Sequence, residues 1–205
     1  QLKEERVQER TIDTTQNFFK TRKRNYCVID VPGHVEFIKN MITGATQADS
    51  AILLIDAKAG IEEQTRRHAY IIHMLGLPID VAVFNKMDLV DYSQKRFLAL
   101  KEELTSFLKS MDAKIPATIP ISAKEGENII KISKRMSWYK GPVLTDALDS
   151  LKAAAAETKK PLRFAVQDIY DIGKEEIIVG KLLSGEIKKD DSVRLFPSLK
   201  QARID

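Results

Sequence analysis

The sequence predicts an α/β domain with a mostly parallel sheet, followed by the start of an all-β unit. Two observations support this prediction. Over roughly the first 150 residues, short apolar runs of strand length alternate with amphipathic segments, and each apolar run ends in a small polar residue. From about residue 160 onward the pattern changes to closely spaced strands that are joined by turns containing glycine.

Composition narrows the class of protein. The chain has 205 residues with 33 Lys+Arg and 29 Asp+Glu, a net charge of +4, and 43% hydrophobic residues, which is typical of a globular protein and not of a disordered one. A single cysteine excludes a disulfide framework and fits a reducing compartment, so we expect a cytoplasmic protein. No apolar run approaches the roughly 20 residues needed to cross a bilayer, and we expect no membrane partner.

The parallel strands are predicted from four apolar runs: Asn25–Asp30, Ser50–Asp56, Ile79–Asn85 and Ala117–Ser122. A further strand at Thr14–Lys20 is joined to the first run by a short loop, which predicts an antiparallel hairpin at the sheet edge. We expect Cys27, inside the first run, to be a small core residue.

Helices are predicted between the strands, where apolar residues recur at helical spacing. These segments cover about residues 35–42, 69–76, 97–111 and 144–156, and Gly76 fits the C-cap of the second. The expected organisation is an α/β domain at 1–156, a linker at 157–160, and an incomplete β-barrel domain at 161–205. The barrel is incomplete because Leu162–Ile169, Glu176–Ser184 and Ser192–Phe196 are too few strands to close one.

The strongest local motif is Asp30-Val31-Pro32-Gly33-His34, directly after a predicted strand. An Asp at this position can hold a magnesium ion through water, and a glycine beyond it lets a backbone N–H approach an anion closely. Asp-x-Pro-Gly is also ordinary turn chemistry, so the motif alone does not decide between a site and a turn.

Two further motifs follow later strands. In Asn85-Lys86-Met87-Asp88, an amide and a carboxylate can together read a purine edge, because a carboxylate accepts from the ring N–H and the exocyclic amine of guanine. A capped loop explains the same residues as well. Ser122-Ala123-Lys124 offers small residues that let the backbone approach a base. Together, the three motifs indicate a ligand site along one rim of one sheet.

In this order, the motifs resemble the guanine-nucleotide-binding domain of the translation-factor GTPases. The segment FIKNMITGATQAD at 37–49 resembles elongation factors Tu and one-alpha. Three segments, QTRRH at 64–68, MDLVDY at 87–92 and MSWYKGPVL at 136–144, are more similar to the GTPase subunit of bacterial ATP sulfurylase. The resemblance implies a P-loop-NTPase-type GTPase domain followed by a translation-factor-type barrel.

The resemblance also implies a role for each matching residue, with GTP and Mg²⁺ as cofactors. Asp30 and Thr11 would hold the magnesium ion, the backbone N–H of Gly33 would contact the γ-phosphate, and His34 would position the attacking water. Asn85 and Asp88 would read guanine while Lys86 stacks on it. Ser122, Ala123 and Lys124 would support the base. Phosphoryl transfer needs positioning and charge stabilisation, which these roles supply.

Two features depart from the family pattern. The sequence contains no Gly-x-x-x-x-Gly-Lys-Ser/Thr, so the first strand and the phosphate-binding loop of the family are missing from it, and we expect this chain by itself to bind GTP poorly. Glu9 and Arg10 stand before Thr11, where the family usually has Gly-Ile.

Three functions remain open. The first is the GTPase of ATP sulfurylase, which couples GTP hydrolysis to adenylyl sulfate synthesis with a catalytic small subunit as partner; the Arg66-Arg67 pair is part of its motivation. The second is an elongation factor that delivers aminoacyl-tRNA, and the third is a protein-binding scaffold without nucleotide. A nucleic-acid partner is expected only for the second, because +4 over 205 residues is a weak signal, and Lys20–Arg24 alone carries four of the positive charges. We treat that basic turn as a candidate partner-docking edge.

Overall fold

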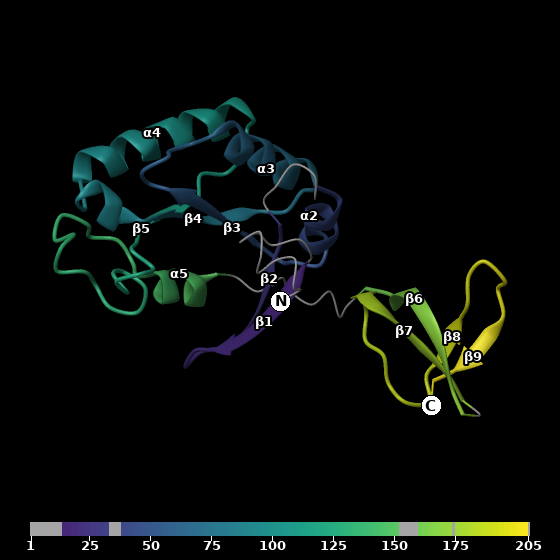
Figure 1. The fold of residues 1–205 in the computed structure, drawn as a ribbon. Coiled ribbons are helices and arrows are strands. Elements are labelled where there is room, and N and C mark those ends of the chain that lie inside the picture. The colour runs from purple at the N-terminus through teal and green to yellow at the C-terminus, as the bar shows by residue number, and fades with distance from the viewer. Residues whose placement is uncertain (1–13, 33–37, 152–159, 174, 205) are drawn as a thin grey trace. The chain divides into compact units, whose positions relative to one another are not determined.

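The computed structural model describes residues 14–32, 38–151, 160–173 and 175–204, which form two compact units, 1–151 and 152–205. Figure 1 shows the elements of both units. The linker expected at 157–160 lies almost wholly outside the described residues. Within them, no helix is long and apolar enough to cross a membrane.

The first unit is built on a parallel sheet of three strands in the order β3-β4-β5. These strands are β3 (Ala51–Asp56), β4 (Ile79–Asn85) and β5 (Ala117–Pro120), as the apolar runs predict. In the register Asp56 lies beside Asn85, and Phe84 beside Pro120. The polar residues that end the strands therefore reach the same edge of the sheet.

Helices cover both faces of this sheet (Figure 1). One face packs against α3 (Glu63–Met74) and α4 (Gln94–Ser110), where Leu100, Leu104 and Leu108 are buried with Phe84. The other face packs Val81, Val83 and Ile119 against Ala147 of α5 (Leu144–Ser150). Helix α2 (Ile38–Ala45) and a 3-10 turn (Met87–Val90) complete the described helices of this unit.

The hairpin of β1 (Thr15–Lys20) and β2 (Asn25–Asp30) is antiparallel, as expected, but it forms a separate two-stranded sheet and not the edge of the parallel one. It contacts two helices instead: β2 lies against α2, and the turn of the hairpin is hydrogen-bonded to α5. The hydroxyls of Thr21 and Tyr26 donate to the Asp149 carboxylate, and Arg24 donates to the carbonyl of Leu151 at 2.8 Å. Arg24, one of the four cations of the basic turn, therefore forms a hydrogen bond within the fold.

Because the hairpin stands apart from the parallel sheet, two expectations were wrong. Cys27 is exposed and not a core residue, and its cross-strand partner Phe18 is 76% exposed. The strand that ends in Asp30 does not belong to the sheet that carries Asn85, so the three motifs do not share the rim of one sheet.

The second unit contains two antiparallel pairs in its described part. The long pair is β6 (Arg163–Ile172) with β7 (Glu175–Ser184), and the short pair is β8 (Ser192–Arg194) with β9 (Gln201–Arg203). A Cβ at Gly180 would lie 2.1 Å from the carbonyl oxygen of Ala165, so only glycine fits this crossing of the two long strands. The fourth strand, β9, was not expected from the sequence.

Candidate functional site

Two loops meet where β4 and β5 end. The first contains Asn85 and the 3-10 turn, and the second contains Ser122 to Lys124. The backbone N–H of Met87 donates to the carbonyl of Ile121 at 3.1 Å, and that of Ile121 donates to the carbonyl of Phe84 at 2.8 Å. Neighbouring parallel strands therefore bring the second and third sequence motifs into one site.

Asn85 joins the two loops through its side chain. Its Oδ1 accepts from the backbone N–H of Lys86 at 2.7 Å and from that of Ala123 at 3.0 Å. No described residue accepts a hydrogen bond from its Nδ2, so this amide nitrogen is available to a ligand. Lys124, beside Ala123, is exposed and reaches solvent.

Asp88 is held by the second loop. The Ser122 hydroxyl, which is fully buried, donates to Oδ1 of Asp88 at 2.6 Å and accepts from the backbone N–H of Glu125 at 3.3 Å. No described residue donates to Oδ2 of Asp88. The carboxylate is therefore oriented by one oxygen and keeps acceptor capacity for two adjacent N–H donors of a ligand.

Lys86 has a left-handed backbone, with φ of 63°, and its ammonium lies 2.7 Å from Oδ2 of Asp56 at the end of β3. The second oxygen of Asp56 accepts from the backbone N–H groups of Lys58 and Ala59 at 2.7 and 3.1 Å. Partial burial opposes ionisation of Asp56, but these hydrogen bonds together hold its pKa below the ordinary value. The hydrogen bond to Asp56 in turn raises the pKa of Lys86.

Asp56 is the residue that the sequence motifs missed. The only signal was its place at the carboxyl end of an apolar run, beside Asn85 in the register. That place is where ligands bind in open parallel sheets, and it brings Asp56 within reach of the lysine of the second motif. The ion pair with Asp56 therefore orients the Lys86 side chain toward the end of β3.

The first motif is described only in part. Asp30 is an exposed carboxylate at the end of β2, and no described residue donates to it or pairs with it. Thr11, Gly33 and His34 lie outside the described residues. The described part of the chain has no cluster of three His, Cys, Asp or Glu side chains for a metal ion. A magnesium ion fits Asp30 as Mg²⁺ is usually held in phosphate sites, by one or two carboxylates with waters and phosphate oxygens.

Comparison with known proteins points to one family. The elongation factor Tu GTP-binding domain matches residues 1–160. Elongation factor 1-alpha of Pyrococcus furiosus is 43% identical over 198 residues, which are 96% of this chain and 46% of that protein. The same factor from Picrophilus torridus is 43% identical over 208 residues, covering 99% of this chain and 49% of that protein.

Solved structures agree with these relatives. A bacterial selenocysteine-specific elongation factor, EF-Sec, matches with a TM-score of 0.69 and 28% identity over 99% of this chain and 33% of its own. A structure of sup35 complexed with GDP matches with a TM-score of 0.56 and 28% identity, over 90% of this chain and 46% of its own. The chain spans less than half the length of each of these proteins.

Proposed function

This chain belongs to the family of the elongation factor Tu GTP-binding domain, the translation-factor-type GTPases, and on that premise we propose that it is the nucleotide-binding part of an elongation factor that carries aminoacyl-tRNA. The observation that supports this proposal is the 43% identity to an elongation factor 1-alpha across 96% of the chain. GTP with Mg²⁺ is the ligand that the family implies.

We assign the roles in the site accordingly. Asp88 accepts from the ring N–H and the amine of guanine, and Asn85 donates its Nδ2 to the base while tying the two loops together. Lys86 lies along the base, and the backbone at Ser122 to Lys124 closes the other side. Asp30 and Thr11 hold Mg²⁺, Gly33 binds the γ-phosphate, and His34 positions the water.

A second function keeps some support from the sequence. The segments at 64–68, 87–92 and 136–144 resemble the GTPase subunit of ATP sulfurylase, which would have a catalytic small subunit as its partner. In the fold, however, Arg66 pairs with Glu103, and Arg67 pairs with Glu63 at 2.7 Å. Because Arg66 and Arg67 already form ion pairs within the chain, their presence does not require a partner subunit. The elongation-factor proposal is therefore favoured.

Binding of aminoacyl-tRNA tests the proposal. We expect the full-length protein with a non-hydrolysable GTP analogue to protect the aminoacyl ester of tRNA from spontaneous hydrolysis, whereas the GDP form gives little protection. Deacylated tRNA is the competitor that controls for general RNA binding. GTP-dependent formation of adenylyl sulfate with a co-purified subunit, without ester protection, would show that the sulfurylase function is the correct one. Failure to bind any guanine nucleotide would favour the scaffold.

The Asp56–Lys86 contact gives a prediction within the site. We expect Asp56→Asn to weaken binding of fluorescent GDP by the full-length protein about tenfold, because Lys86 loses its anchor and a charge-assisted hydrogen bond contributes about 1.5 kcal/mol or more. The matched control is Asp80→Asn, since Asp80 forms the same type of pair, 2.8 Å from Lys114, at the opposite end of β4. Equal weakening by both variants would rule out a specific role for Asp56.

A further inference from the structure

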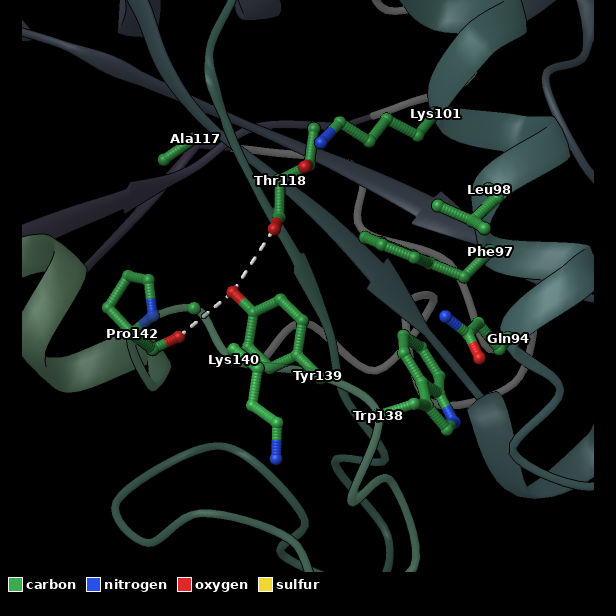
Figure 2. Close-up of a pocket in the computed structure, with 11 residues that line it drawn as sticks. Gln94, Phe97, Leu98, Lys101, Ala117, Thr118, Trp138, Tyr139, Lys140 and Pro142 are labelled. Atoms are coloured by element: carbon green, nitrogen blue, oxygen red, sulfur yellow. Dashed lines mark hydrogen bonds between the residues drawn. The ribbon is translucent and has the colours of Figure 1, made fainter.

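A cavity of about 340 Å³ lies away from the nucleotide loops, between α4 and the loop that carries Trp138 to Pro142 (Figure 2). It borders Ala117 and Thr118 at the beginning of β5, whereas Ser122 follows the end of that strand. The cavity therefore lies beside β5, an edge strand of the parallel sheet, and none of the roles assigned above uses it.

The walls of the cavity are aromatic and fixed in place. Phe97 is 3% exposed and packs edge-on against Tyr139, with ring centroids 6.1 Å apart, while Trp138 and Tyr139 are half-buried. The Tyr139 hydroxyl lies 3.2 Å from the carbonyl of Thr118 and 3.1 Å from that of Pro142. The indole N–H of Trp138 donates to the carbonyl of Tyr92 at 3.0 Å.

Because the fold already uses these polar atoms, the aromatic residues offer carbon surface to a ligand. Burial also raises the pKa of Tyr139 to about 12, so its ring is neutral at physiological pH. A neutral wall of ring faces and edges favours a second aromatic ring, packed offset or edge-to-face.

Positive charge flanks this aromatic surface. Lys101 reaches from α4 toward Thr118, and Lys140 lies on the other side of the Tyr139 ring (Figure 2). In the parts of the chain that the structure describes, no ion pair involves either lysine. The helical neighbours of Lys101 at three and four positions are Phe97, Leu98, Leu104 and Thr105, so α4 offers it no acid. Two uncompensated cations beside an aromatic wall complement a ligand that combines an aromatic ring with negative charge.

The open side of the cavity indicates the source of that ligand. Leu98 lines it and is 49% exposed, and Lys101 and Pro142 at its border are exposed as well. An aromatic ring bound in the cavity could therefore belong to a longer molecule, the rest of which would cover Leu98. We propose that this cavity is a docking site for a peptide segment of a partner protein, in which an aromatic side chain enters between Trp138, Tyr139 and Leu98 while flanking acidic residues pair with Lys101 and Lys140.

Trp138 makes the proposal directly measurable, since it is the only tryptophan in the chain. The probe is the peptide acetyl-Asp-Glu-Phe-Glu-Asp-amide, which has no tryptophan of its own. We expect it to change Trp138 fluorescence saturably and to bind more weakly as NaCl is raised, because the charged groups are near the surface. The same peptide with alanine in place of phenylalanine should give no saturable change.

Charge reversal tests the two lysines. The double variant Lys101→Glu/Lys140→Glu should weaken binding of the peptide about five- to thirtyfold, from two surface pairs of about 0.5–1 kcal/mol each. The control Lys95→Glu/Lys109→Glu makes the same charge change at exposed positions of α4 outside the cavity lining and should bind like the unaltered chain. Leu98→Ala should also weaken binding while retaining the circular dichroism of the unaltered chain.

Several results would overturn the proposal: no saturable change with the peptide, equal binding by the two double variants, or equal binding of the alanine peptide. Free phenylacetate that binds as tightly as the peptide would identify a small-molecule site and also count against it. All of these measurements are made without nucleotide, so their failure is distinct from failure of the proposed GTPase function.

Discussion

Replacing Asp88 by asparagine is expected to reverse the base preference of the nucleotide site. We expect Asp88→Asn in the full-length protein to weaken GDP binding roughly 100-fold and to strengthen binding of xanthosine diphosphate by a similar factor. The loss corresponds to about 3 kcal/mol, which is the upper range for hydrogen bonds to a charged group. Competition of the two nucleotides against fluorescent GDP and XDP measures the change.

The geometry gives the physical reason. Ser122 donates to Oδ1 of Asp88, which orients the side chain without using its full acceptor capacity. A carboxylate has only acceptors and so matches the ring N–H and amine of guanine. An asparagine in the same orientation would accept from the Ser122 hydroxyl and the ring N–H through its oxygen. Its NH₂ would then face the base and match the 2-oxo group of xanthine.

Asp91→Asn is the matched control, because Asp91 closes the same 3-10 turn with an αL backbone that asparagine also tolerates. We expect it to leave the base preference unchanged. If Asp88→Asn retains a preference for guanine while its melting temperature matches the unaltered protein, then Asp88 does not read the base.

The sequence was sufficient for the bounds of two strands. The residue ranges of β2 and β4 match the predicted runs, because each apolar run is bounded by polar residues at the point where the strand ends. The pairing of β2 was not predictable in the same way. Its apolar residues indicate a strand, but which edge it pairs with depends on contacts between distant segments, and this is why Cys27 is exposed against expectation.

The same distinction applies to the site. The sequence motifs contain the groups to which we assign recognition of the base. In the structure, Ser122 donates to Asp88, and Asn85 accepts from the backbone of Ala123. Asp56 was missed because its role comes from the register of β3 against β4, which no local motif encodes. The aromatic cavity was missed for a similar reason, since Trp138 alone fits either packing or binding, and only the fold places Lys101 of α4 beside it, together with Lys140.

Replacing His34 by alanine is expected to slow GTP hydrolysis with little effect on nucleotide binding. We expect His34→Ala in the full-length protein to lower the single-turnover hydrolysis rate roughly 100-fold, the lower range for a side chain that assists proton transfer or positions a reacting group. The affinity for GTP should change by less than about twofold, because an interaction made only in the transition state lowers kcat and leaves ground-state binding intact.

This expectation rests on the place of the first motif in the chain. Strand β2 ends at Asp30, whose carboxylate has no partner among the described residues, and Pro32 is fully buried, which fixes the chain as it leaves the strand. The motif then continues directly to Gly33 and His34, the residues that the family resemblance assigns to the γ-phosphate and the water.

The control is His73→Ala, which removes an imidazole from α3, far along the chain from this motif. Equal losses of binding and hydrolysis in His34→Ala would mean that this histidine holds the nucleotide and does not act on the water.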